Sequence, residues 1–238
     1  MGQTGGVVER ETKLRGFDGA EVPVFIAEPQ GAPGAPRVAI VQEIFGITPW
    51  VRDVARRLAR EGFRAVAVEQ FSREPLGDDP GWPALIARMN NLSFPGLVTD
   101  LRAGLELLGG DSKTSVIGFC MGGTIALLFA ADGKPLDACV SCYGRVRLAQ
   151  ELGPLHPEHP LDVASRIRCP VLGIYGEKDA SIPLADLDAL REKLPRGSEI
   201  ALYPAGHAFL NDTRPDFHSP GQAPLAWAKI TGFLRRTL

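Results

Sequence analysis

The six residues Gly118-Phe-Cys-Met-Gly-Gly123 form the most specific chemical pattern in the 238-residue chain. An apolar, strand-like run at 115–118 leads into them, and a helical run at 124–130 follows. A nucleophile between glycines on such a strand-turn-helix projects above the sheet. The pattern predicts Cys120 as nucleophile, with its thiolate stabilised by the helix N-terminus and its oxyanion by the Met121 N–H. Taken alone, the motif also fits a glycine-rich turn around a structural cysteine.

An acid and a histidine follow this turn, each just after another apolar run. Asp179 lies in Gly176-Glu-Lys-Asp-Ala180, and His207 lies in Pro204-Ala-Gly-His-Ala-Phe209. In a nucleophilic triad the histidine takes the proton of the nucleophile, while the buried acid orients the ring and stabilises imidazolium. Nucleophile, acid, histidine is the chain order of α/β hydrolases. Each residue alone is typical of a solvated loop, but together they predict a triad of Cys120, Asp179 and His207.

The elements that must position this triad alternate between short β-branched runs and longer helical patterns. This alternation predicts an α/β fold with a mostly parallel central sheet and helices on both faces, formed by a single domain over residues 1–238. Strands are expected at residues 21–27, 37–42, 65–68, 115–118, 138–143, 171–175 and 199–203.

Proline marks the start of several predicted helices. One begins at Thr48-Pro49, one runs from Pro95 to Leu108, one runs from Pro183 to Leu194, and the last covers roughly 220–238. The segment 71–91 is rich in Pro, Gly and Asp and has little periodicity, so it is expected to form either a lid or pocket wall or an inert loop.

Composition narrows the classes of function. Apolar residues make up 45% and charged residues 23%, and the formal net charge is −2, as in an ordinary globular protein without affinity for nucleic acid. Neither a signal-peptide core nor an apolar run of the roughly 18 residues needed to span a membrane is present. We therefore expect a cytoplasmic protein, monomeric or a small homo-oligomer, that acts on a small molecule.

The other cysteines and histidines are weaker candidates for chemistry. Cys139 and Cys142 mimic a C-x-x-C pair but lie in an apolar strand, where alternation points them to opposite faces, so we expect buried thiols. His156 and His159 are close in a proline-rich stretch without an evident third metal ligand. His218 is the alternative base. Neither a metal nor an organic cofactor is expected.

With the triad residues in place, the chain resembles the dienelactone hydrolase (carboxymethylenebutenolidase) family over essentially its whole length. A further matching motif is Gln42-Glu-Ile-Phe-Gly46. The resemblance implies that Glu43 is buried beside the resting thiol and helps to switch it to thiolate when substrate binds. It also implies that the oxyanion hole is formed by the amides of Ile44 and Met121. The apolar residues around Glu43 independently favour its burial over a solvated position.

The resemblance is weaker at the groups that hold substrate. Family members that act on dienelactone bind its carboxylate with arginines, one of them shortly after the catalytic histidine, but the fourth residue after His207 is Asn211. The residues expected to contact substrate are Arg88, Tyr143 and Arg145, with Arg214 as a further cation.

The sequence thus predicts a hydrolase that cleaves a small ester or lactone through a thioester on Cys120. The alternatives are a general carboxylesterase, thioesterase or acyltransferase on the same scaffold, a non-catalytic ligand-binding member, and a thiol redox protein. The last of these requires a second cysteine within disulfide reach of Cys120.

Overall fold

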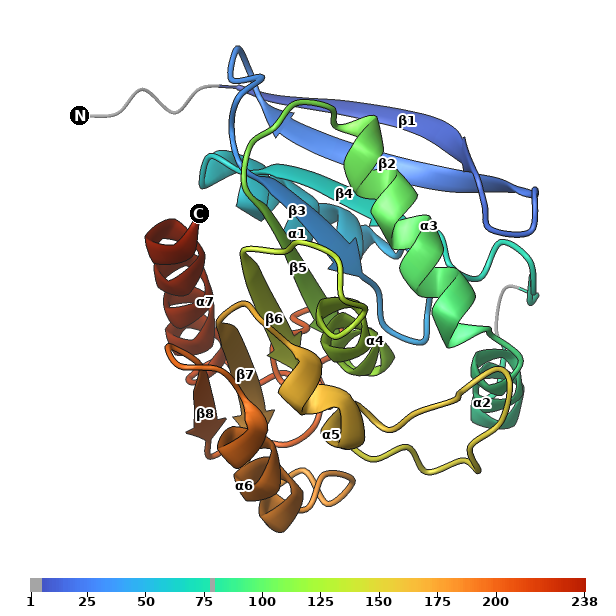
Figure 1. Cartoon of the computed structure of the whole chain (residues 1–238), viewed down its shortest axis with the longest axis vertical. Helices are drawn as coiled ribbons and strands as arrows, with labels where there is room; N and C mark the ends of the chain where they lie inside the picture. The colour runs from blue at the N-terminus through green and yellow to red at the C-terminus, as the bar shows by residue number, and fades with distance from the viewer. Residues whose placement is uncertain (1–5, 78–79) are drawn as a thin grey trace.

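A sheet of eight strands forms the centre of the computed structural model, which describes residues 6–77 and 80–238 (Figure 1). The spatial order is β1-β2-β4-β3-β5-β6-β7-β8. The strands are β1 (Val7–Arg15), β2 (Glu21–Pro29), β3 (Arg37–Val41), β4 (Arg64–Val68), β5 (Thr114–Phe119), β6 (Ala138–Cys142), β7 (Val171–Gly176) and β8 (Glu199–Tyr203). The N-terminal residues 1–5, where a signal segment would begin, and residues 78–79 of the segment 71–91 lie outside the described residues.

The expected mostly parallel sheet is confirmed. The strands from β4 through β3 and β5 to β8 pair in parallel, while β1, β2 and β4 pair antiparallel. The central strands are buried along nearly their whole length, which explains their continuous apolar sequences. The seven predicted strands omitted β1, an edge strand whose residues are mostly exposed and charged.

Seven α-helices and one 3₁₀ helix accompany the strands in the described part of the chain. Thr48 caps α1 and Ser93 caps α3 through side-chain oxygens that accept backbone N–H groups. The helices are α1 (Pro49–Arg60), α2 (Trp82–Asn90), α3 (Phe94–Leu107), α4 (Met121–Ala130), α5 (Pro160–Val163), η1 (Ala164–Arg166), α6 (Leu184–Lys193) and α7 (Ala223–Thr237). The last helix begins three residues after the predicted position of 220, and α2 occupies the segment 71–91, where no helix was predicted.

Helices cover both faces of the sheet, as expected. In Figure 1, α3 and α4 lie in front of the sheet and α1 lies behind it. The last helix, α7, shares the face of α1, because Arg57 of α1 lies 5.5 Å from the ring centroid of Trp227 in α7. The long connection from β6 to α5 extends to α2 and α3, where the Phe94 N–H donates to the Leu155 carbonyl at 2.9 Å. No helix in the described residues is long and apolar enough to cross a membrane.

Candidate active site

Cys120 lies between the end of β5 and the start of α4, in a backbone conformation that few residues adopt. Its φ is 55° and its ψ is −120°, and its N–H donates to the Cys142 carbonyl at 3.0 Å. The turn is too tight for side chains on its flanks, since a Cβ at Gly118 would lie 1.9 Å from the Gly122 carbonyl oxygen. The glycines of the motif therefore permit the close approach of β5 and α4 that presents Cys120 at the strand end.

Backbone strain is concentrated around this residue. Among the residues that the structure describes, the non-glycine positions with positive φ are Cys120, Tyr143 at 41° and Ala208 at 54°. All three line the same cavity. Conformations of this kind cost on the order of 1–3 kcal/mol each and cluster at functional sites.

His207 and Asp179 lie side by side on the loops after β8 and β7. His207 Nδ1 and Asp179 Oδ2 are 2.6 Å apart, and the Asp179 side chain is only 2% exposed. The other carboxylate oxygen of Asp179 accepts hydrogen bonds from the Ser181 N–H and hydroxyl at 3.0 and 2.6 Å. The Tyr143 ring meets the imidazole edge-on, with the centroids 5.3 Å apart. The imidazole is thus fixed in orientation by an acid on one side and an aromatic ring on another.

Opposing effects set the charges of this pair. Burial disfavours the Asp179 carboxylate, but the hydrogen bonds from His207 and Ser181 outweigh burial and lower the pKa of Asp179. Burial also disfavours a charged imidazole, yet the hydrogen bond to Asp179 and the adjacent Cys120 thiol raise the pKa of His207. The contacts with Asp179 and Cys120 thus favour the protonated imidazole.

Glu43 follows β3 and is almost completely buried, with 2% exposure. Its Oε2 accepts a hydrogen bond from Asn211 Nδ2 at 2.7 Å, and Asn211 is held in this orientation because its Oδ1 accepts from Thr213. Burial raises the pKa of Glu43 to about 7, although the Asn211 hydrogen bond and the charges of His207 and Arg214 oppose the shift. Glu43 can therefore gain or lose a proton near neutrality.

The backbone amides of Ile44 and Met121 follow Glu43 and Cys120 directly in the chain. Both residues line the cavity. In the described part of the chain, neither amide donates a hydrogen bond to a protein acceptor. Amides of this kind, one from the loop after β3 and one from the first turn of α4, can stabilise an oxyanion formed above Cys120.

The cavity that these groups line has a volume of about 680 Å³. Its walls are largely apolar, and α2 forms one of them, so the segment 71–91 contributes a pocket wall rather than an inert loop. Arg88 was the α2 residue predicted to contact substrate, whereas the apolar side chains of this helix were not singled out, because the segment offered no periodic pattern. The apolar lining residues include Phe45, Trp82, Ile86, Met89, Phe94, Leu148 and Phe217, and the lining Arg and Lys residues are Arg145, Lys178 and Arg214.

The residues predicted to bind substrate fall into two groups. Tyr143 and Arg145 line the cavity, as does Arg214, whose guanidinium lies 4.0 Å from the centroid of the Phe45 ring. Arg88 is not among the described residues that line it. Its Nη2 instead donates to the Ile44 carbonyl at 2.8 Å, and its guanidinium lies 3.8 Å from the centroid of the Phe71 ring.

The weaker candidates are not among the described residues that line the cavity. His156 packs edge-on against Phe94 with centroids 4.3 Å apart, and His159 accepts a hydrogen bond from the Leu148 N–H. Within 6–77 and 80–238, no three metal-ligating side chains of the His, Cys, Asp or Glu type gather in one place. Cys139 and Cys142 are buried, and burial raises the pKa of both thiols. Cys120 is the one cysteine among the described residues that line the cavity.

Known proteins with this architecture are similar to the chain over nearly its whole length. A "Putative carboxymethylenebutenolidase" of Yersinia pestis is 39% identical over 232 residues, which cover 91% of this chain and 84% of that protein. The crystal structure of a "Putative Dienelactone Hydrolase" from Klebsiella pneumoniae superposes with a TM-score of 0.86 at 34% identity, covering 96% of this chain and 98% of that one. An esterase of Pyrococcus furiosus, at 16% identity and a TM-score of 0.69, shares the fold over 97% of this chain and 93% of its own.

The sheet order, the turn at Cys120 and the loops after β7 and β8 define an α/β hydrolase fold, and these structures confirm it. The sequence profile of the dienelactone hydrolase family matches residues 22–238. The chain belongs to the dienelactone hydrolase family and is an enzyme of the hydrolase class.

Proposed function

We propose that the protein cleaves a small ester or lactone by nucleophilic catalysis at Cys120. The observation that carries this proposal is the position of Cys120 on a strained turn beside His207, whose Nδ1 lies 2.6 Å from the buried carboxylate of Asp179. This arrangement supports the roles of nucleophile for Cys120, base for His207 and orienting acid for Asp179 in acyl transfer.

In the first half of the reaction, His207 removes the thiol proton and the Cys120 sulfur attacks the substrate carbonyl carbon. A C–S bond forms, and the carbonyl electrons move to the oxygen, where the Ile44 and Met121 amides stabilise the charge. The oxyanion then collapses and the C–O bond breaks. The leaving alkoxide takes the proton from His207, and in a lactone it stays tethered to the acyl group.

In the second half, water hydrolyses the thioester. His207 removes a proton from the water as its oxygen attacks the thioester carbonyl carbon, the C–S bond breaks, and the Cys120 sulfur takes the proton back from His207, so that the acid leaves and the thiol is restored. Glu43 acts beside this cycle: with a pKa of about 7, its carboxyl group can take up or release the proton that accompanies activation of the thiol.

The walls of the cavity suit a substrate with a substantial apolar part, because most of the lining residues are apolar or aromatic. Arg145, Lys178 and Arg214 add positive charge at the cavity. A general carboxylesterase or thioesterase activity is the second candidate. It is favoured by the residue at position 211. This residue is an asparagine whose side chain is bonded to Glu43, so no arginine is available there to bind a substrate carboxylate.

The test is hydrolysis of a panel that contains dienelactone, an uncharged lactone, short p-nitrophenyl esters and thioesters. Cys120→Ala is compared with wild type and with Cys169→Ala, a control in which a buried thiol away from the cavity is removed. We expect turnover of at least one ester or lactone, its loss in Cys120→Ala, and its retention in Cys169→Ala. Equal activity of Cys120→Ala and wild type would contradict the mechanism.

The same panel separates the two candidate activities. Preference for dienelactone would support the narrow activity, whereas turnover of neutral esters alone would support the carboxylesterase. A covalent acyl adduct on Cys120, trapped with a slow ester and seen by mass spectrometry, would locate the intermediate.

A further inference from the structure

The loop at 42–47, between β3 and α1, carries both Glu43 and the Ile44 amide. Its residues form a turn and no regular element, and Gly46 has a φ of +88°. Within the loop, the Gly46 N–H donates to the Glu43 carbonyl at 3.3 Å, and contacts from elsewhere in the fold add to this support.

The carboxylate of Glu69, just after β4, contacts both ends of this loop. Its Oε1 accepts a hydrogen bond from Gln42 Nε2 at 3.0 Å, and its Oε2 accepts one from the Ile47 N–H at 2.8 Å. Oε1 also accepts from the Phe71 N–H at 3.1 Å. Both oxygens are therefore engaged, and the residues on either side of Glu43 and Ile44 are held by one side chain.

A second contact holds the middle of the loop. Arg88 of α2 donates to the Ile44 carbonyl at 2.8 Å, while its guanidinium lies over the ring of Phe71. The N–H of Phe71 is in turn bonded to Glu69. Burial lowers the pKa of Arg88, and the charge of Glu69 opposes that shift. Glu69 and Arg88 thus both contact the loop, and Phe71 contacts each of them.

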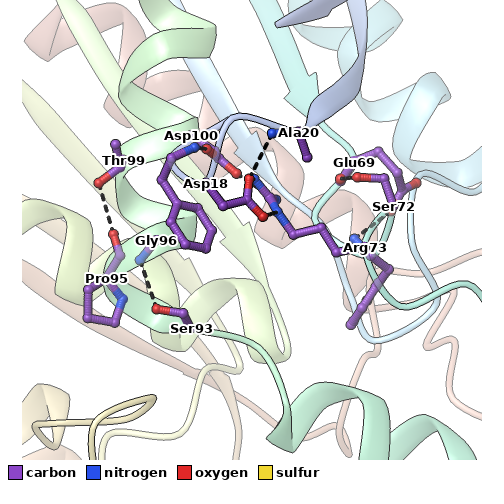
Figure 2. Close-up of polar contacts among 12 residues, drawn as sticks. Asp18, Ala20, Glu69, Ser72, Arg73, Ser93, Pro95, Gly96, Thr99 and Asp100 are labelled. Carbon is purple, nitrogen blue, oxygen red and sulfur yellow. Dashed lines mark hydrogen bonds and ion pairs between the residues drawn. The ribbon is translucent and has the colours of Figure 1, made fainter. Parts of the chain in front are cut away.

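The segment that carries Glu69 is itself tied to the rest of the fold. The Glu69 N–H donates to the Pro23 carbonyl at 2.9 Å, and the Ser72 hydroxyl donates to the Glu69 carbonyl at 3.1 Å. Figure 2 shows this segment and, beyond Ser72, the side chain of Arg73 bound to Asp18. These hydrogen bonds hold the Glu69 backbone in place, so its side chain can position the loop.

We propose that Glu69 is a positioning residue of the reaction, whose carboxylate holds the 42–47 loop so that the Ile44 amide points at the forming oxyanion. The inference rests on the proposed function, since it assigns a support to the oxyanion hole described there. Glu69 is not among the described residues that line the main cavity. Its action is entirely through the loop.

The chemistry of the contacts explains why a carboxylate is needed. The three groups that point at Glu69 are all N–H donors. A glutamine has one acceptor oxygen and places an NH₂ group against at least one of those donors. An alanine leaves them all without an acceptor, and a partly buried unpaired N–H is costly.

The experiment compares Glu69→Gln and Glu69→Ala with Asp137→Asn as a matched control. Asp137 is also a half-buried carboxylate that accepts a backbone N–H, from Thr114 at 2.8 Å, but at the opposite end of β5 from Cys120. Because a misplaced or lost oxyanion donor costs roughly 10²-fold or more, we expect kcat to fall about 10- to 100-fold in Glu69→Ala and less in Glu69→Gln. The KM of the Glu69 variants, and both kcat and KM of Asp137→Asn, should change less than about twofold.

Two further measurements separate positioning from general damage. Alkylation of Cys120 by iodoacetamide needs the thiolate but no oxyanion hole, so its rate should stay near that of wild type in Glu69→Gln. Binding of a substrate-like aldehyde, which forms a tetrahedral adduct on the thiol, should weaken by the same factor as kcat/KM.

The inference is overturned if both Glu69 variants keep wild-type kcat, or if alkylation falls in parallel with kcat. Should Glu69→Ala not fold, Glu69→Gln alone tests the role of the carboxylate by the same criteria. An active Cys120→Ala variant would instead refute the proposed function, while an inactive one together with fully active Glu69 variants would refute only the role of Glu69.

Discussion

Two carboxylates are buried to almost the same depth in this protein and have very different surroundings. Glu43 is 2% exposed and Asp100 of α3 is 1% exposed. Glu43 faces the neutral amide of Asn211 at the edge of the cavity. Asp100 accepts the Phe17 N–H at 2.7 Å and lies 2.8 Å from the Arg73 guanidinium, in the cluster shown in Figure 2.

The difference separates a carboxylate suited to chemistry from one suited to structure. Asp100 has a permanent cation beside it, and Arg73 is bound on its other side by both oxygens of Asp18. The negative charge of Asp100 is therefore compensated inside the fold. The nearest hydrogen-bonding group to Glu43 carries no charge, so burial raises its pKa to about 7 and leaves its proton exchangeable. The region around Cys120 should therefore govern kcat, and the Asp100 cluster should govern stability.

Asp179→Asn is expected to have the largest effect. The substitution keeps the size of the side chain but removes the charge that supports imidazolium and fixes the tautomer of His207, so kcat should fall about 10³- to 10⁴-fold. Steady-state kinetics on the best ester of the panel measure the loss, and Asp18→Asn in the Asp100 cluster is the control, with kcat near that of wild type. A loss below tenfold would mean that Asp179 does not orient the base.

Asp100→Ala should lower the free energy of unfolding and leave kcat almost unchanged. Removing one partner of a buried ion pair leaves Arg73 without its charge partner and the Phe17 N–H without its acceptor, so the free energy of unfolding should fall by about 3 kcal/mol. Urea unfolding followed by circular dichroism gives the value, and kcat should remain within about threefold of wild type. Asp188→Ala, at an exposed pair with Arg191, serves as control and should change stability by less than about 0.5 kcal/mol. A large loss of kcat in folded Asp100→Ala would break the division between the two regions.

The same contrast explains what the sequence could reveal. Cys120, Asp179 and His207 each follow an apolar strand, so their convergence could be expected from the parallel sheet alone. The cluster of Asp18, Arg73 and Asp100 has no such pattern, because its members come from a turn, a loop and a helix that only the fold brings together. The antiparallel edge strand β1 was missed because its mostly exposed, charged residues lack an apolar period. Glu69 and Arg88 act on a loop far from them in sequence, and no local spacing indicated those contacts.

Glu43→Gln should produce a pH-dependent gain in stability. The pKa of Glu43 is about 7 in the folded protein and close to 4.5 when unfolded, so its charged form is disfavoured by folding. Folding carries no such penalty below pH 4.5, and the penalty grows to about 3 kcal/mol above pH 7. Glutamine mimics the neutral acid, so the variant should be more stable than wild type by up to this amount at pH 8 and by less than about 1 kcal/mol at pH 5. Urea titrations at both pH values test this, and an equal effect at both would show that Glu43 does not change charge in this range.

Arg214→Ala is expected to have the smallest effect. It tests whether the two regions also differ in their cations, Arg73 in the Asp100 cluster and Arg214 at the cavity. Arg73 is held by two carboxylates, whereas Arg214 lines the cavity and makes no ion pair with the residues described. An uncompensated guanidinium on a cavity wall attracts an anionic substrate. For an ester that carries a carboxylate, kcat/KM should fall about tenfold, or about 1.4 kcal/mol, with less than a twofold change for its uncharged analogue. Arg147→Ala, whose guanidinium pairs with Asp186 outside the described cavity lining, is the control. If both substrates lose equally in Arg214→Ala, the arginine serves the packing of Phe45 and Phe217, and the charge of the substrate is not what it recognises.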